Sequence, residues 1–97
     1  MINVGFFYSV IPGKEEEFET TFKEVVKFLR TGHSGIKDAK LYRDVDQPGE
    51  FMIFTEWDTV ESFKDFTTSR PFKNTTEAGK QILKSHPRHI VLRAENI

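Results

Sequence analysis

The sequence predicts an α+β fold with one antiparallel sheet, on the basis of two observations. A turn signal at Pro48-Gly49 separates two strand-like runs, which predicts a central β-hairpin with a loop of three to four residues. A strand and a helix precede this hairpin, and a helix and a strand follow it. The resulting order is βαββαβ, with two similar βαβ halves, which is the ferredoxin-like pattern.

The first half of the chain contributes a strand and a long helix before the hairpin. Residues 2–11 are rich in β-branched and aromatic side chains at odd and even positions alike, which predicts a strand buried on both faces. Residues 14–30 are predicted to be helical, because acidic residues occupy the first turn and basic residues the last. One apolar stripe follows this helix, formed by Phe18, Phe22, Val25, Val26 and Leu29.

The second half begins with the later hairpin strand, which leads directly into another helix. Asp58 is expected to be the N-cap of that helix, and Glu61 completes a predicted capping box. Pro71 suits the first turn of a renewed helical segment, which Pro87 is expected to end. Residues 88–95 are predicted to form the last strand.

Length and composition together predict a single domain that forms a homo-oligomer. The chain has 97 residues, so we expect one domain over residues 1–97, with its core at about 2–94. A domain of this size buries only roughly 60–65% of its unfolded surface. The chain nevertheless contains ten phenylalanines. A second buried surface is therefore expected, and a second copy of the chain is the simplest way to supply it.

The composition of the chain argues against several classes of partner and of functional site. The net charge is −1 and there is no basic block, which argues against nucleic acid and anionic membranes as partners. Cysteine is absent, which excludes disulfide scaffolds and thiol catalysis and is compatible with the cytoplasm, where we expect the protein. No secretory signal is recognised, and no apolar run approaches the roughly 18 residues of a membrane span.

Four segments together resemble the antibiotic biosynthesis monooxygenase (ABM) domain family. They are residues 10–18, 41–43 with 48–50, 56–63, and 69–73. The resemblance implies a dimer of ferredoxin-like subunits whose sheets pack into an α/β barrel. It also implies a pocket in each subunit between the helices and the sheet. Family members differ in chemistry, from cofactor-free oxidation of polycyclic phenols to haem degradation, so the site must be argued from its residues.

Trp57 is the strongest single candidate for the pocket wall. The resemblance places a tryptophan of the pocket at the end of the third strand, and an indole offers a stacking face and one N–H donor. Strand alternation puts Thr55 on the same face as Trp57. Phe6, Tyr8 and Phe63 are expected to line the same pocket. Plain core packing is the alternative for Trp57 and for Tyr8.

Two departures from the family limit the chemistry that the resemblance implies. Haem-degrading members carry an asparagine and a histidine at the places of Phe6 and Thr76, so haem is expected to bind weakly and without a histidine-type spectrum. Quinone-forming members carry an asparagine and a tyrosine at the places of Ile53 and Phe63. No cofactor is therefore expected.

Three histidines remain as candidates for chemistry: His33, His86 and His89. We expect no metal site, because Pro87 separates the last two histidines and no carboxylate or cysteine completes a ligand set. His89 is the candidate for a catalytic base, since it could face the pocket from the last strand. His33 is expected to be solvated in a loop.

These observations predict a small ABM-like protein that acts as a cofactor-independent monooxygenase on an aromatic or otherwise electron-rich small molecule. A non-enzymatic ligand-binding or regulatory dimer is the alternative, favoured by the missing polar residues, and a haem-degrading member is a third. An RNA-recognition module shares the element order, but residues 51–57 lack the basic and glycine positions of that motif.

Overall fold

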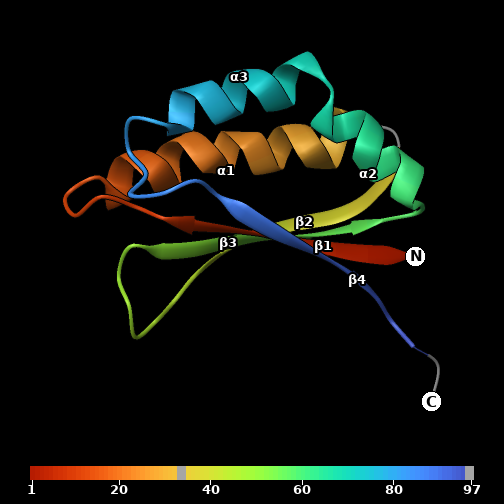
Figure 1. The fold of residues 1–97 in the computed structure, drawn as a ribbon, viewed down its shortest axis with the longest axis horizontal. Helices are drawn as coiled ribbons and strands as arrows, with labels where there is room; N and C mark the ends of the chain where they lie inside the picture. The colour runs from red at the N-terminus through yellow and green to blue at the C-terminus, as the bar shows by residue number, and fades with distance from the viewer. Residues whose placement is uncertain (33–34, 96–97) are drawn as a thin grey trace.

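Three helices lie on one face of a four-stranded antiparallel sheet (Figure 1). The computed structural model describes residues 1–32 and 35–95. The elements are β1 (Ile2–Ser9), α1 (Glu15–Gly32), β2 (Ile36–Arg43), β3 (Glu50–Trp57), α2 (Val60–Thr67), α3 (Arg70–Gly79) and β4 (Arg88–Arg93). The strand order is β2-β3-β1-β4 and each neighbouring pair is antiparallel. The predicted ferredoxin-like α+β fold is confirmed.

The register around β1 determines which side chains face the helices. Phe6 lies opposite Ile53 of β3 and His89 of β4, so these three side chains share one face of the sheet. Tyr8 lies two residues further along β1 and shares that face. The helix-facing side chains form the core together with the apolar stripe of α1. Its largest fully buried members include Trp57, Phe18, Phe22, Leu29, Ile53 and Val4.

The loop between β2 and β3 spans residues 44–49, so the prediction of three to four residues is wrong. Its second half is the predicted turn: Gly49 has a φ of 104° and the Glu50 amide donates to the Gln47 carbonyl at 3.1 Å. Its first half is a separate turn, because the Asp44 carboxylate accepts a hydrogen bond from the amide two residues on at 2.8 Å. This local bond competes with strand pairing and lengthens the loop.

α2 begins one residue later than predicted. Thr59 is the N-cap, since its hydroxyl oxygen accepts a hydrogen bond from the Ser62 amide at 3.1 Å. Asp58 instead accepts a hydrogen bond from the Ser62 hydroxyl at 2.8 Å. This bond, above all, holds the pKa of the exposed Asp58 carboxyl below its usual range. The predicted capping box between Asp58 and Glu61 is therefore wrong.

α3 is shorter than the predicted helical segment. Ser69 is its N-cap and Pro71 lies in its first turn, as predicted, but the helix ends at Gly79 rather than near Pro87. Residues 80–87 return to the sheet instead, where the Lys84 amide donates to the Ser9 carbonyl at 2.8 Å. Backbone hydrogen bonds to the end of β1 replace the helical ones, and they lead the chain into β4.

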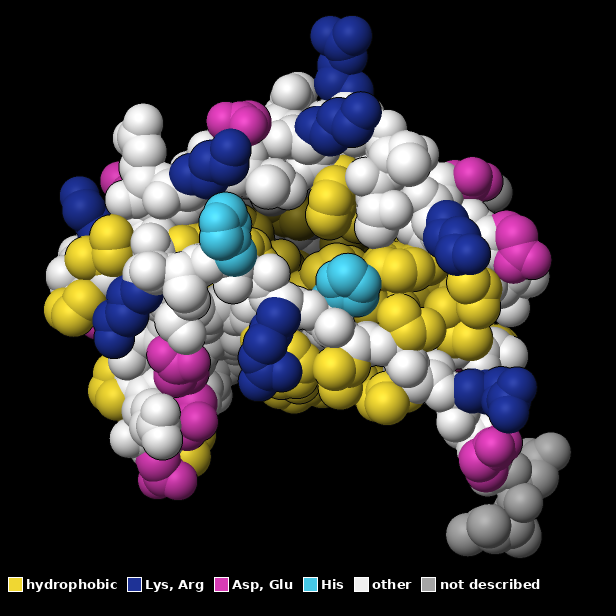
Figure 2. Space-filling view, in the orientation of Figure 1, with side chains coloured by type: hydrophobic (Ala, Val, Ile, Leu, Met, Phe, Trp, Pro, Cys, Tyr) yellow, Lys and Arg dark blue, Asp and Glu magenta, His cyan; other side chains and the backbone are white. Residues whose placement is uncertain are grey.

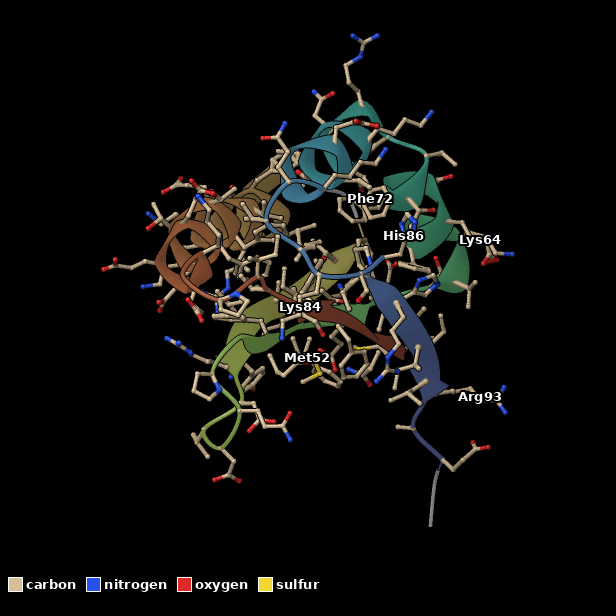
Figure 3. The ribbon with its side chains drawn as sticks, turned by 60° about the vertical axis from the view of Figure 1, so that its left-hand side comes forward. Met52, Lys64, Phe72, Lys84, His86 and Arg93 are labelled. Carbon is tan, nitrogen blue, oxygen red and sulfur yellow. The ribbon has the colours of Figure 1, made fainter. Side chains whose placement is uncertain are left out.

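The sheet face away from the helices also carries hydrophobic side chains. Phe7 lies opposite Met52, and Phe54 and Ile90 flank Gly5. Figure 3 shows Met52 on the side of the sheet opposite the helices. Phe7, Met52 and Phe54 are partly buried, whereas Ile90 on the edge strand is 40% exposed. β1 is therefore hydrophobic on both faces, but none of the helices among the described residues covers the second face.

Trp57 closes the core at the end of β3. Its side chain is fully buried, and its indole N–H donates to the Thr55 hydroxyl at 2.7 Å. The Thr55 hydroxyl in turn donates to the Val4 carbonyl of β1 at 2.8 Å. The ring centroids of Phe63 and Phe66 of α2 lie 5.8 and 5.5 Å from that of Trp57. The hydrogen bond to Thr55 gives the indole nitrogen of this large buried side chain a partner.

Two glycines with positive φ allow a matched test of the packing between β2 and α2. Gly35 has a φ of 89°, and a methyl group added there would overlap the Ser62 side chain. Gly13 has a φ of 92° and open space around it. We expect Gly13→Ala to cost about 1 kcal/mol, the usual penalty of this backbone region. Gly35→Ala should cost about 1–3 kcal/mol more, because the overlap adds to that penalty.

Urea unfolding of the wild type and both alanine variants measures this difference. Equal free energies of unfolding for Gly13→Ala and Gly35→Ala would show that Ser62 moves aside at no cost, and would contradict the tight packing of this corner.

Candidate functional site

A cavity of about 640 Å³ lies between the sheet and helices α1 and α3. Figure 2 shows this side of the molecule, with a hollow whose floor is hydrophobic and histidine side chains beside it. The volume is in the range of small-molecule sites, roughly 300–1,000 Å³. The hydrophobic walls are formed by Phe6, Tyr8, Phe22, Val25, Phe28, Leu29, Ile53, Phe66, Pro71, Phe72 and Leu83.

Tyr8 supplies a polar group on the sheet side of the cavity. Its ring centroid lies 5.2 Å from that of Phe18 and 5.1 Å from that of Phe22, so the ring is held from α1. Its hydroxyl makes no hydrogen bond to any residue in 1–32 or 35–95. Burial raises the pKa of the Tyr8 phenol above its usual range, so the group stays protonated. The cavity wall therefore carries an O–H donor that a ligand oxygen could use.

His89 reaches the same cavity from β4. It lies opposite Phe6 in the strand register, and its ring centroid is 5.9 Å from that of Phe6 and 5.7 Å from that of Phe63. Its imidazole forms no hydrogen bond or ion pair with a residue that the structure describes. An imidazole in this place can accept a proton from a bound ligand.

The segment before β4 forms the rim of the cavity. His86, Pro87 and Arg88 all line it, and Figure 3 labels His86 together with Phe72, which lines the cavity from α3. The guanidinium carbon of Arg88 lies 4.5 Å from the ring centroid of Phe7, which belongs to the opposite face of the sheet. Arg88 forms no ion pair with a carboxylate among the described residues.

The α3 side of the cavity offers few free donors. Thr75 and Thr76 line it, but their hydroxyls donate to the carbonyls of Pro71 and Phe72 on the same helix, each at 2.9 Å. Their oxygens can therefore only accept hydrogen bonds from a ligand. Thr76 stands at the place where the family resemblance implies a histidine in haem-degrading members, and no histidine of α3 lines this wall.

Trp57, Thr55 and Phe63 do not line this cavity. Trp57 and Thr55 are buried at the end of β3, under α2, whereas the cavity opens between α1, α3 and β4. Phe63 lies directly behind the wall, with its ring centroid 5.9 Å from that of Phe6. Strand alternation correctly indicates the face of Trp57, but it does not indicate which helix covers that end of the strand.

Sequence reasoning missed the rim and much of the helical wall. The sequence offers His86 only as a metal ligand, since its position at the rim depends on the return of residues 80–87 to β1, which no periodicity indicates. Phe28 and Phe72 also line the cavity without having been predicted to do so. The apolar face of residues 70–79 is the signal that could have found Phe72.

The described part of the chain also bears on metal binding and membrane association. No three histidine, cysteine, aspartate or glutamate side chains come together there to hold a metal ion. None of its helices is long and apolar enough to cross a membrane. A second hollow of about 420 Å³ lies on the other side of His86 and Arg88, with Asp44 and Glu50 among its lining residues. His33 lies outside the described residues.

Comparison with known proteins adds a family to this geometry. Residues 1–78 match the model of the antibiotic biosynthesis monooxygenase family. A relative from Natronomonas pharaonis, named "Putative heme-binding protein NP_2262A", is 33% identical over 89 residues. The match covers 92% of this chain but only 15% of that relative. The chain thus spans about a sixth of the length of the curated relatives that it matches.

Solved structures share the fold over nearly their whole length. A protein of Deinococcus radiodurans has a TM-score of 0.91 at 15% identity, and the match covers 100% of this chain and 95% of that one. SnoaB, a cofactor-independent oxygenase from Streptomyces nogalater, has a TM-score of 0.84 at 18% identity, with 99% and 94% covered. At these identities the likeness concerns the fold alone, while the family match extends over most of the sequence. The chain belongs to the antibiotic biosynthesis monooxygenase family.

Proposed function

We propose that the chain is a homodimeric, cofactor-independent monooxygenase that oxidises an aromatic or otherwise electron-rich small molecule bound in the cavity. Tyr8 is the observation that carries this proposal. A phenol hydroxyl that has no hydrogen-bond partner among the described residues, on the wall of a hydrophobic cavity, is suited to the oxygen atom of a ligand. Family membership supports the proposal. The cytoplasm is the compartment that we propose, since a chain without cysteine suits a reducing environment.

In the proposed mechanism the protein binds the substrate, removes a proton and excludes water. A substrate hydroxyl gives its proton to the His89 imidazole, and the electron pair stays on the substrate. The Tyr8 hydroxyl donates a hydrogen bond to the resulting oxyanion and stabilises it. The electron-rich anion then reduces molecular oxygen. One oxygen atom enters the substrate as a carbonyl oxygen, and the other leaves as water with two hydrogens that the substrate loses, so the phenol is oxidised to a quinone with oxygen as the sole oxidant.

Residues behind the cavity wall support this site in our proposal. Phe63 packs against Phe6 and His89, and Trp57 packs against Phe63. A ligand that displaces Phe6 or His89 would move Phe63 and thereby change the surroundings of the Trp57 indole. Because Trp57 is the only tryptophan, its fluorescence can report ligand binding without the indole touching the ligand.

A ligand-binding or regulatory dimer without activity is the main alternative. It uses the same cavity and the same Tyr8 donor, but no proton transfer to His89. Oxygen uptake separates the two functions, because only the enzyme consumes oxygen when a phenol is bound.

Haem is a second candidate ligand, which the name of the Natronomonas pharaonis relative favours. Phe6 and Thr76 cannot ligate iron, but His86 and His89 line the cavity from the other side, and an imidazole nitrogen is a common axial ligand of haem. These histidines would hold a bound haem, whose iron would supply redox chemistry.

The first prediction from the site concerns phenol binding. Tyr8→Phe should weaken binding of 1-naphthol about five- to tenfold, because it removes one hydrogen bond to the ligand. Binding of 1-methylnaphthalene, which has no hydroxyl, should not change. Titration calorimetry measures both affinities, and Tyr42→Phe on the opposite face of the sheet is the matched control. Equal losses for the two ligands would contradict a hydrogen bond from Tyr8.

The role of His89 as the base is tested by measuring oxygen uptake with a panel of naphthols in an oxygen electrode. His89→Gln should retain naphthol binding and lower the rate of oxygen uptake by about 10²–10⁴-fold. Naphthol binding without any oxygen uptake by the wild type would instead support the non-enzymatic dimer.

The second prediction concerns assembly through the hydrophobic sheet face. Sedimentation across a micromolar dilution series should show a dimer, because Ile90 and the side chains near it are not covered within the chain. Ile90→Asp should weaken the dimer by about a hundredfold. Val45→Asp, in a loop where Val45 is 94% exposed, is the control and should not. A well-folded monomer at every concentration would overturn the homodimer.

The third prediction concerns haem. We expect haem to bind weakly and without a histidine-type absorption spectrum, because the α3 wall offers Thr76 in place of an imidazole and the two histidines at the opposite side, His86 and His89, are exposed to solvent. Titration with haemin, followed by absorbance, measures this for the wild type and for His86→Gln and His89→Gln. A histidine-type spectrum that disappears in one of these variants would show that haem is held from the rim, and would favour the haem function.

A further inference from the structure

We propose that assembly of the homodimer tightens ligand binding in the cavity, because strand β4 belongs to both surfaces. One side of β4 borders the cavity, and its other side belongs to the open face, which is the hydrophobic sheet face away from the helices. The inference rests on the proposed function, since it uses the same cavity and the same dimer. It adds regulation to that function, because the affinity for a ligand then depends on the state of assembly.

Consecutive residues of β4 contribute to the two surfaces. His89 lies opposite Phe6 in the strand register and lines the cavity. Side chains alternate along a strand, so Ile90, which lies opposite Gly5, belongs to the open face, and Leu92 shares that face. The backbone between His89 and Ile90 therefore connects the cavity wall directly to the surface that a second copy would cover.

β4 is the less firmly held of the two edge strands. It pairs with β1 alone, and all six of its residues are exposed. The other edge strand, β2, has a fully buried residue in Ala39, whose carbonyl accepts a hydrogen bond from Arg30 of α1 at 2.8 Å. An element with little buried hydrophobic area opens at a lower free energy than the rest of a fold. Release of β4 from β1 is therefore the local opening that we expect first.

The position of His89 depends on β4 being in place. Its ring centroid lies 5.9 Å from that of Phe6 and 5.7 Å from that of Phe63, and both phenylalanines are buried. The imidazole has no hydrogen bond or ion pair with a residue in 1–32 or 35–95. Ring packing and the pairing of β4 with β1 therefore hold His89 at the wall, and a ligand loses this contact when β4 opens.

A second copy of the chain suits the open face in both hydrophobicity and charge. Charged side chains of both signs lie on this face, among them Lys40 of β2 and Glu56 of β3, and neither forms an ion pair within the described residues. A twofold axis brings the same patch of two copies together, so hydrophobic area meets hydrophobic area and opposite charges can pair. The hydrophobic side chains of the patch are Phe7, Met52, Phe54, Ile90 and Leu92.

Covering Ile90 and Leu92 holds β4 from its open side and so raises the fraction of molecules with a complete cavity. The apparent affinity of a ligand increases in proportion to that fraction. We expect an increase of about fivefold in the dimer, at the lower end of the usual range of coupling, because only one strand is affected. By linkage, a ligand must strengthen the dimer by the same factor for each cavity that it fills, which gives about 25-fold for two cavities.

Two variants that disrupt the dimer from different strands test this coupling. Ile90→Asp changes β4, whereas Phe54→Asp changes β3 and leaves β4 as it is. Both should be folded monomers by sedimentation and denaturant unfolding, and both should bind 1-naphthol about fivefold more weakly than the wild-type dimer in titration calorimetry. Val45→Asp, in the exposed loop, is the control, which should remain a dimer with wild-type affinity.

Sedimentation of the wild type provides a second measurement that requires no variant. Saturating 1-naphthol should lower the dissociation constant of the dimer about 25-fold. An unchanged dissociation constant would overturn the coupling, even if both aspartate variants failed to fold.

The variants and the proposed function can fail separately. Wild-type affinity for 1-naphthol in both monomeric variants would overturn the coupling and leave the proposed function intact. A loss in Ile90→Asp alone would also overturn it, because the effect would then come from β4 itself and not from assembly. If the wild type is a monomer at every concentration, or binds no naphthol, the proposed function fails and the coupling fails with it.

Discussion

The central strand β1 is the constraint on which the rest of the structure depends. It pairs with β3 on one edge and with β4 on the other, and its side chains alternate between two hydrophobic faces. Val4 and Phe6 are buried under the helices, whereas Phe7 lies on the open face. Because one chain has only enough helix to cover one face, the fold is left with a hydrophobic surface that a second copy can cover.

The cavity and the core occupy the same face of this sheet but are closed by different helices. α2 packs its rings onto Trp57 at one end, which leaves no room there for a ligand. α1 and α3 leave a hollow over Phe6 and Tyr8, which the segment before β4 borders. The site is therefore a consequence of incomplete closure, and Tyr8 and His89 are wall groups that make no side-chain hydrogen bond to a residue in 1–32 or 35–95.

Binding and selectivity come from different parts of this cavity in our proposals. The aromatic walls favour a hydrophobic body through burial, a term that does not distinguish among ligands of similar shape. Tyr8 and His89 lie on the sheet side, where a ligand oxygen could be bound and deprotonated. His86 lies at the rim of the cavity. Tyr8 and His89 act on the same ligand oxygen but in different steps, so binding and oxygen uptake separate their contributions.

The sequence by itself determined the order of the elements, the face of each strand and the charge pattern of α1, because periodicity and turn chemistry are local properties. It also indicated Phe6, Tyr8 and His89, which share one face of the sheet. Only the tertiary structure decided that Trp57 is enclosed by α2 and that His86 borders the cavity. Both depend on how segments distant in sequence pack together, which no local pattern encodes. Element boundaries shifted for the same reason: a cap at Thr59, an aspartate turn at residue 44 and the return of residues 80–87 each depend on hydrogen bonds that form only in the folded chain.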